Sequence, residues 1–277
     1  MKKEILTVIL ICLSLLAVGQ NTDYLQKNNV PYYPNQGKDL ENLISERCRL
    51  DVYYPKSRAK FSTLIWFHGG GLTAGNKEIP AELMDKGICV IGVGYRLSPA
   101  VTSPGYIEDA AAAVAWVFDN IEKMGGDTSR IFLSGHSAGA YLVSMITLDK
   151  SWLNKYKIDA NRIAGLISLS GQAITHFTIR KENGLAETKV VVDELAPLHF
   201  VRADAPPILL ITGDRELELL GRYEENAFLM RMMTVTGHRN TRLMELQGYG
   251  HDMAKPAFPL LLKEINRIVI SRGGNLR

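Results

Sequence analysis

The sequence has few cysteines, and their spacing provides no zinc-binding motif. Only Cys12, Cys48 and Cys89 occur in 277 residues, and none of them has a neighbouring cysteine or histidine at the short spacing of a zinc site. Cys48 and Cys89 each fall in a strand-like run, so we expect two buried thiols. A single disulfide between them, formed in an oxidising compartment, is the alternative.

Blocks of like charge are also missing. The chain has 32 Lys and Arg residues against 29 Asp and Glu residues, and its formal net charge of +3 is spread along its length. A surface that follows a phosphate backbone needs a dense basic stretch, so nucleic acid is not an expected partner. Beyond residue 19 no apolar run approaches the about 20 residues of a spanning helix, and no stable membrane span is expected there.

The first 19 residues differ in composition from the rest of the chain. Lys2 and Lys3 precede an apolar run over residues 5–17, and the small-x-small pattern Ala17-Val18-Gly19 follows. This order predicts a cleavable signal peptide over residues 1–19, and therefore a secreted or periplasmic protein. An amino-terminal membrane anchor is the alternative, although the run is short for a spanning helix.

The remaining residues, 20–277, are expected to form a single domain. The chain is 46% hydrophobic and 22% charged, which fits an ordinary globular core. Residues 20–42 are polar and rich in turn residues, so we expect them to wrap the surface before the fold begins. Short apolar runs then alternate with helical periodicities, which predicts an α/β fold with a mainly parallel sheet and helices on both faces. The expected strands are 48–54, 61–67, 89–95, 130–133, 163–169, 208–212 and 241–246, and the expected helices are 107–121, 140–148, 224–235 and 259–270.

A candidate nucleophile lies between the fourth of these strands and the helix after it. The pentapeptide Gly135-His136-Ser137-Ala138-Gly139 predicts a tight turn in which the glycines let the backbones pass closely. Such a turn presents the Ser137 hydroxyl above the sheet, where it can attack a carbonyl carbon. An incidental glycine-rich turn is the alternative, but the strand before it and the helix after it favour the nucleophile.

A second glycine motif, His68-Gly69-Gly70-Gly71, directly follows the strand 61–67. Backbone N–H groups without side chains in the way can donate to the anionic oxygen of a tetrahedral intermediate. We therefore predict an oxyanion hole made by the amides of Gly70, Gly71 and Ala138. A flexible glycine loop is the alternative, and His68 itself is expected to shape this loop.

A serine nucleophile needs a base, and histidine is the usual one because its pKa lies near neutrality. His251 stands out among six histidines, because it lies just beyond the last predicted strand, at the same edge of the sheet as Ser137. The acid that orients it should follow the strand 208–212. Asp214 and Glu216 both satisfy the chain order of serine, acid and histidine.

These motifs together resemble the α/β-hydrolase superfamily. Within it the chain is similar to the His-Gly-Gly-Gly esterases and lipases, which include hormone-sensitive-lipase-like and feruloyl-esterase-like enzymes. The resemblance runs from about residue 48 to residue 270, and it implies a mainly parallel eight-stranded sheet. In such enzymes the acid commonly lies three residues after the glycine that ends its strand, which favours Glu216 over Asp214, with Glu218 as a third candidate.

The resemblance implies a serine hydrolase that cleaves carboxylic esters through an acyl-enzyme, without a metal or an organic cofactor. The predicted export and a small lid-like segment near residues 172–200 favour small-molecule or carbohydrate substrates, with short acyl, acetyl or feruloyl groups. An amide hydrolase (formamidase or peptidase) and a non-catalytic binding protein are the alternatives. Five aromatic residues either line the pocket or anchor the packing: Tyr24, Tyr32, Tyr33, His176 and Phe177.

Overall fold

Eight strands form one sheet in residues 23–33, 41–219 and 221–273, the parts of the chain that the computed structural model describes. The order across the sheet is β1-β2-β4-β3-β5-β6-β7-β8, in which β1 and β2 run antiparallel to their neighbours and the others run parallel. The prediction of a mainly parallel eight-stranded sheet is confirmed. The strands are β1 (Tyr24–Pro31), β2 (Arg49–Pro55), β3 (Phe61–Phe67), β4 (Cys89–Val93), β5 (Gly126–His136), β6 (Gly165–Leu169), β7 (Ile208–Gly213) and β8 (Thr241–Leu246).

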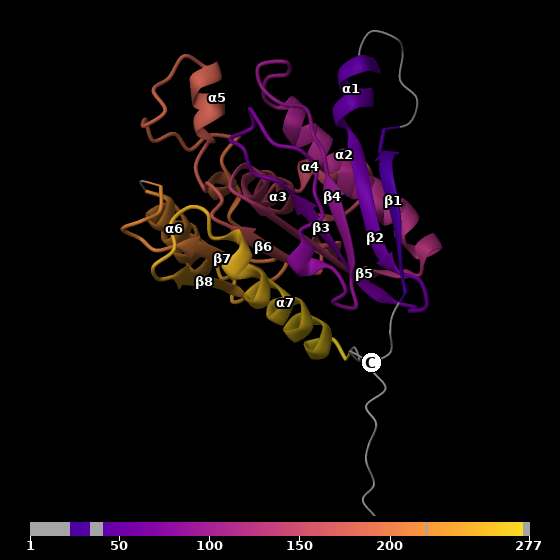
Figure 1. The fold of residues 1–277 in the computed structure, drawn as a ribbon. Coiled ribbons are helices and arrows are strands. Elements are labelled where there is room, and N and C mark those ends of the chain that lie inside the picture. Colours follow the sequence, from indigo (N-terminus) through magenta and orange to yellow (C-terminus); the bar gives the residue numbers. More distant parts are fainter. Residues whose placement is uncertain (1–22, 34–40, 220, 274–277) are drawn as a thin grey trace, which may run out of the picture.

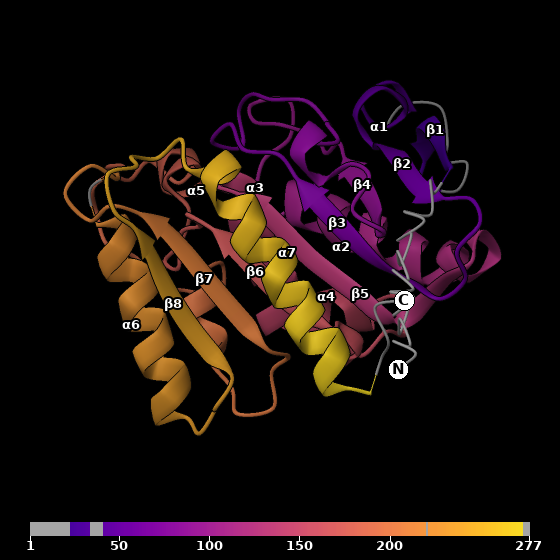
Figure 2. The same cartoon turned by 60° about the horizontal axis from the view of Figure 1, so that its bottom comes forward.

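Helices cover both faces of this sheet, as the sequence predicts (Figure 1). Figure 2 shows α7 crossing one face, with α2, α3 and α4 behind the strands on the other. The segment between β6 and β7 carries only the short helix α5 and one turn of 3-10 helix at Pro197–Phe200. The α-helices are α1 (Glu41–Arg47), α2 (Gly105–Asn120), α3 (Ala138–Leu148), α4 (Ser151–Asn154), α5 (Phe177–Glu182), α6 (Arg222–Val235) and α7 (Ala254–Ser271).

The inner strands β3, β4, β6 and β7 are buried on both faces because most of their side chains are apolar. In β3, Ile65 and Phe67 join the core beneath α2, α3 and α6, whereas Leu64 and Trp66 join the core beneath α7. Successive side chains of a strand point to opposite faces, so a continuous apolar run feeds two cores at once. This packing fixes the strand ends, and with them the loops that carry the candidate site.

The first strand was not predicted. Residues 20–42 were expected to wrap the surface, but Tyr24–Pro31 pairs antiparallel with β2 at the edge of the sheet. Most of its side chains are exposed, so the run has none of the apolar signal that marks the inner strands. Its edge position is specified by backbone pairing with β2.

Both cysteines of the described chain are buried free thiols, in agreement with the preferred expectation. Cys12 and the predicted signal peptide at residues 1–19 lie outside the described residues. Within the described ranges, no helix has the length and apolar character needed to cross a bilayer.

Candidate active site

Ser137 occupies the turn between β5 and α3 in a strained conformation. Its φ of 54° and ψ of −114° lie outside the regions that L-residues favour. The turn is closed by close backbone approach, because a Cβ on Gly139 would lie 2.1 Å from the carbonyl oxygen of Phe67. Glycine is therefore required where α3 passes the end of β3, and Ser137 is held at the carboxyl edge of the sheet.

His251 links Ser137 to a carboxylate. Its Nε2 lies 2.9 Å from Ser137 Oγ, and its Nδ1 lies 2.6 Å from Glu218 Oε1. The three residues follow β5, β7 and β8, whose carboxyl ends lie at the same edge of the sheet. The structure thus brings together Ser137 and His251, as the sequence predicts, and the acid beside His251 is Glu218, the third of the three candidates.

The Glu218 carboxylate is buried and is surrounded by donors. Oε2 accepts from Ser170 Oγ at 2.6 Å and from the Gly213 amide at 3.1 Å, and Oε1 accepts from the Leu219 amide at 2.8 Å. Burial alone would raise the pKa of Glu218, but the hydrogen bonds from His251, Ser170 and Leu219 outweigh it and lower the pKa to about 2. The group is therefore an anion at neutral pH, and the anionic form is the one that orients an imidazole.

The prediction of Glu216, with Asp214 as alternative, does not agree with this geometry. The amides of Leu217 and Glu218 donate to the Asp214 carbonyl at 3.1 and 2.8 Å, which forms a helical turn directly after β7. This turn brings residue 218 back over the end of the strand and leaves the side chain of Glu216 in solvent. The Asp214 carboxylate accepts instead from the amides of Glu216 and Gly248, both at 2.9 Å, and so ties the two loops together.

The pKa shift of Glu218 predicts a specific dependence of stability on pH. A carboxylate whose pKa is lowered on folding stabilises the fold above its unfolded pKa, near 4.5, and loses that contribution as pH falls towards 2. The difference in the free energy of unfolding between the wild type and Glu218→Gln should therefore become smaller by at most about 3 kcal/mol as the pH falls through this range. Denaturant titrations of both proteins at several pH values measure this difference. A difference that does not change with pH would contradict the lowered pKa of Glu218.

His136 supports the loop that carries His251. Its Nε2 lies 2.8 Å from the carbonyl oxygen of His251 and, since a carbonyl only accepts, this nitrogen carries the proton. Burial and the neighbouring His251 lower the pKa of His136, which favours the neutral ring. His136 thus holds the backbone of His251.

The glycine loop lies against Ser137. A Cβ on Gly69 would lie 3.5 Å from Ser137 Cβ, and one on Gly70, at φ 113°, would lie 2.2 Å from the carbonyl oxygen of Ala74. Only glycine fits at position 70. His68 shapes the loop as expected, because its buried ring stacks on Tyr95 at 4.4 Å and its Nδ1 lies 2.6 Å from the Gly69 carbonyl oxygen.

Phe177, one of the five aromatic residues named above, lies beside this loop. Its ring would contact a Cβ on Gly71 at 3.0 Å, and the neighbouring Thr178 Oγ1 donates to the Gly71 carbonyl at 2.5 Å. The 172–200 segment therefore packs on the glycine loop, while its action as a lid stays a prediction. Three others anchor the packing: the Tyr24 ring stacks on Tyr53, the Tyr32 hydroxyl donates to the Gly94 carbonyl, and the Tyr33 hydroxyl donates to the Asp109 carboxylate. The His176 side chain is fully buried.

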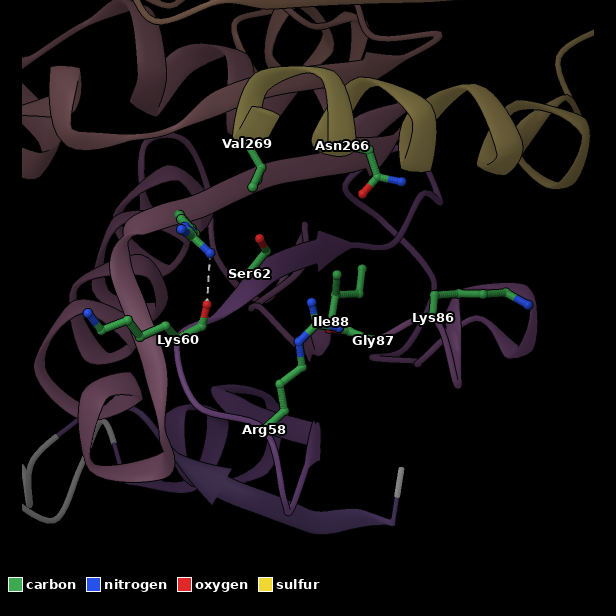
Figure 3. Close-up of a pocket in the computed structure, with 9 residues that line it drawn as sticks. Arg58, Lys60, Ser62, Lys86, Gly87, Ile88, Asn266 and Val269 are labelled. Carbon is green, nitrogen blue, oxygen red and sulfur yellow. Dashed lines mark hydrogen bonds between the residues drawn. The ribbon is translucent and has the colours of Figure 1, made fainter. Parts of the chain in front are cut away.

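A pocket of about 140 Å³ lies at the other edge of the sheet (Figure 3). Ser62 of β3 and Asn266 of α7 face it, whereas the ends of Lys60 and Lys86 point away. Lys60 and Ser62 lie at the amino end of β3 and Lys86 lies just before β4, opposite the loops that follow the carboxyl ends. The pocket is therefore separate from the chemistry at Ser137. Within the described ranges, no group of His, Cys, Asp and Glu residues is suited to hold a metal ion.

Comparison with known proteins agrees with this architecture. A solved structure described as a truncated form of a carbohydrate esterase from gut microbiota superimposes with a TM-score of 0.70, at 20% identity, over 88% of this chain and 96% of that chain. The protein has the α/β-hydrolase fold. Residues 50–177 of this chain match the BD-FAE family model, which agrees with the resemblance to hormone-sensitive-lipase-like and feruloyl-esterase-like enzymes predicted from the motifs.

Two curated relatives of this chain come from Mycobacterium tuberculosis. Esterase LipQ (strain ATCC 25618 / H37Rv) is 26% identical over 69% of this chain and 49% of its own length. Carboxylesterase NlhH (strain CDC 1551 / Oshkosh) is 34% identical over 34% of this chain and 32% of its own length. The chain thus spans about half the length of the first relative and a third of the second. The family match ends at residue 177, before Glu218 and His251, so these two positions rest on the geometry.

Proposed function

We propose that this α/β-hydrolase cleaves carboxylic esters, with Ser137 as nucleophile, His251 as general base and Glu218 as the acid that orients it. One observation carries the proposal: the His251 ring bridges Ser137 Oγ at 2.9 Å and the Glu218 carboxylate at 2.6 Å. Nucleophile, base and orienting acid in this order form the arrangement that activates a serine hydroxyl. The similarity to named esterases supports the same class of reaction.

In the first half of the reaction, Ser137 Oγ attacks the ester carbonyl carbon while its proton passes to His251 Nε2. The carbonyl π electrons move to oxygen, which gives a tetrahedral oxyanion. Glu218 stays ionised and stabilises the imidazolium through Nδ1–H. When the oxyanion collapses, the bond to the alcohol oxygen breaks, His251 returns the proton to that oxygen, and Ser137 keeps the acyl group.

The amides of Gly70, Gly71 and Ala138 are proposed as the oxyanion hole. The glycine loop lies against Ser137, and Ala138 is the first residue of α3, where backbone N–H groups have no acceptor within the helix. In the described ranges, no residue accepts a hydrogen bond from these three amides. They are thus available to an oxygen that becomes negative during the reaction.

Water completes the second half of the reaction. His251 removes a proton from the water as it attacks the acyl carbon, and then returns the proton to Ser137 Oγ as the carboxylic acid leaves. Every proton transfer uses the same imidazole, and no step requires a metal or an organic cofactor.

The proposed substrates are small-molecule or carbohydrate esters with short acyl groups, such as acetyl, or with a feruloyl group. Phe177 beside Gly71 supports a confined acyl position, because its ring occupies the space next to the glycine loop. A solved structure of the same fold is described as a carbohydrate esterase, and this supports a sugar on the alcohol side. The proposed cleavable signal at residues 1–19, if removed on export, would place the enzyme in the periplasm or outside the cell.

The test is turnover of p-nitrophenyl acetate together with labelling by a fluorophosphonate probe. We expect hydrolysis well above buffer and covalent labelling at Ser137, because the probe reacts with an activated serine. A panel of acetylated and feruloylated sugars then identifies the ester. Preference for formamides or dipeptides over esters would show that the protein is an amide hydrolase instead. Folded protein that the probe does not label would indicate a non-catalytic binding protein.

A further inference from the structure

The geometry points to Ser170 as a positioning residue that holds Glu218 and His251 in line with Ser137. The inference rests on the proposed function and adds a fourth side chain to the same site. Ser170 directly follows β6, the strand between those that carry Ser137 and Glu218, and its side chain is fully buried.

The Ser170 hydroxyl contacts two members of the triad. Its Oγ lies 2.6 Å from Glu218 Oε2 and 3.1 Å from His251 Nδ1. A hydroxyl has one proton, and an ionised carboxylate only accepts, so Ser170 donates to Glu218. The lone pairs of the same oxygen are left to face the Nδ1–H group of His251.

This arrangement selects one tautomer of the base. Nδ1 of His251 faces two acceptors, Glu218 Oε1 at 2.6 Å and Ser170 Oγ at 3.1 Å, and both favour a proton on Nδ1. Nε2 then keeps its lone pair for the Ser137 proton. Ser170 also holds Oε2, the carboxylate oxygen that does not touch the imidazole, and so fixes the rotation of the carboxylate.

The backbone of Ser170 is held in a conformation that serine rarely adopts. Its φ is 52°, in the left-handed region that favours glycine. The Ser170 amide donates to the Ile211 carbonyl of β7 at 2.7 Å, and the Ser170 carbonyl accepts from the buried guanidinium of Arg222. Glycine would fit this backbone with less strain, so the hydroxyl is the group that distinguishes serine here.

The same strand end also touches the nucleophile. The Ser137 amide donates to the carbonyl of Leu169, the residue before Ser170, at 2.8 Å. The dipeptide 169–170 thus contacts Ser137 through its backbone, and Glu218 and His251 through one hydroxyl. Displacement of this strand end would change all three positions at once.

Two substitutions separate the hydroxyl from the backbone. Ser170→Gly and Ser170→Ala both remove Oγ, but only glycine relieves the strain at φ 52°. We expect both variants to lower kcat for p-nitrophenyl acetate by about 10- to 100-fold, with KM changed by less than about threefold. Ser170→Gly should unfold at a higher denaturant concentration than Ser170→Ala.

Ser134→Ala is the matched control, because it removes another buried serine hydroxyl, one that donates to the Ile167 carbonyl at 2.6 Å outside the triad. Its kcat should stay within about twofold of the wild type. Equal loss of kcat in the two Ser170 variants, despite their different stabilities, supports positioning by the hydroxyl. If activity instead follows stability, so that Ser170→Gly retains wild-type kcat, the inference is overturned.

The wild type distinguishes this failure from failure of the proposed function. If the wild type hydrolyses the ester and the kcat of Ser170→Gly equals that of the wild type, only the role of Ser170 is overturned. A wild type that neither hydrolyses an ester nor is labelled at Ser137 overturns the proposed function, and the role of Ser170 with it. If only labelling is observed, the labelling rates of the wild type, Ser170→Gly and Ser134→Ala provide the same comparison.

Discussion

Ser137→Ala is expected to lower kcat/KM for p-nitrophenyl acetate by about 10⁵- to 10⁶-fold, because no other atom can form the acyl-enzyme. Covalent labelling by the fluorophosphonate probe should disappear with it. Steady-state hydrolysis, measured on protein whose unfolding transition matches that of the wild type, gives the comparison.

The control for this variant is Ser144→Ala, two turns further along α3. The Ser144 hydroxyl is buried and donates to the Ala140 carbonyl within its own helix at 2.7 Å, so its removal leaves the site untouched. Activity of Ser144→Ala should stay within a few-fold of the wild type. Residual activity of Ser137→Ala above about one hundredth would mean that another group attacks the ester, and the assignment of Ser137 would be wrong.

Glu218→Gln is the second substitution with a large expected effect, a loss of about 10³- to 10⁴-fold in kcat. Glutamine has nearly the same shape, but it is neutral and cannot stabilise the imidazolium. Its amide N–H₂ can also face His251 Nδ1 and force the proton onto Nε2, the nitrogen that must accept from Ser137. The kcat of purified variants for p-nitrophenyl acetate is the measurement.

Glu216→Gln is the matched control for Glu218→Gln, since it makes the same chemical change two residues away. The Glu216 side chain is exposed, so kcat should change by no more than about twofold. A large loss in Glu216→Gln together with an active Glu218→Gln would restore the acid that the sequence favours. If only Asp214→Asn causes a large loss of kcat, the acid that orients His251 would be Asp214.

The fold was largely predictable because its inner strands are apolar on both faces. Runs such as 61–67 and 208–212 are too short for helices and too continuous for a half-exposed sheet, so they predict buried parallel strands. The edge strand β1 escaped prediction because its exposed side chains carry no such pattern. Its register depends on backbone pairing, which leaves no periodic signal in the sequence.

The site was predictable only where local chain geometry decides it. Ser137 is fixed by a tight turn with glycines on both sides, and His251 by its place after the last strand. The identity of the acid depends on a helical turn that follows β7. The sequence does not show how far this turn extends, and so it does not show which carboxylate reaches the histidine. Ser170 has no motif, since its role comes from a contact between the ends of β6 and β7.

Ser137 and His251 lie 114 residues apart, and they follow β5 and β8, the first and last of four neighbouring strands that also come in this order along the chain. A nascent chain that has emerged only as far as β6 already carries Ser137 and Ser170, but neither Glu218 nor His251. Its serine is an ordinary alcohol until β7 and β8 add to the sheet. On the proposed mechanism, the Ser137 hydroxyl therefore becomes reactive only after the last strand has joined the sheet.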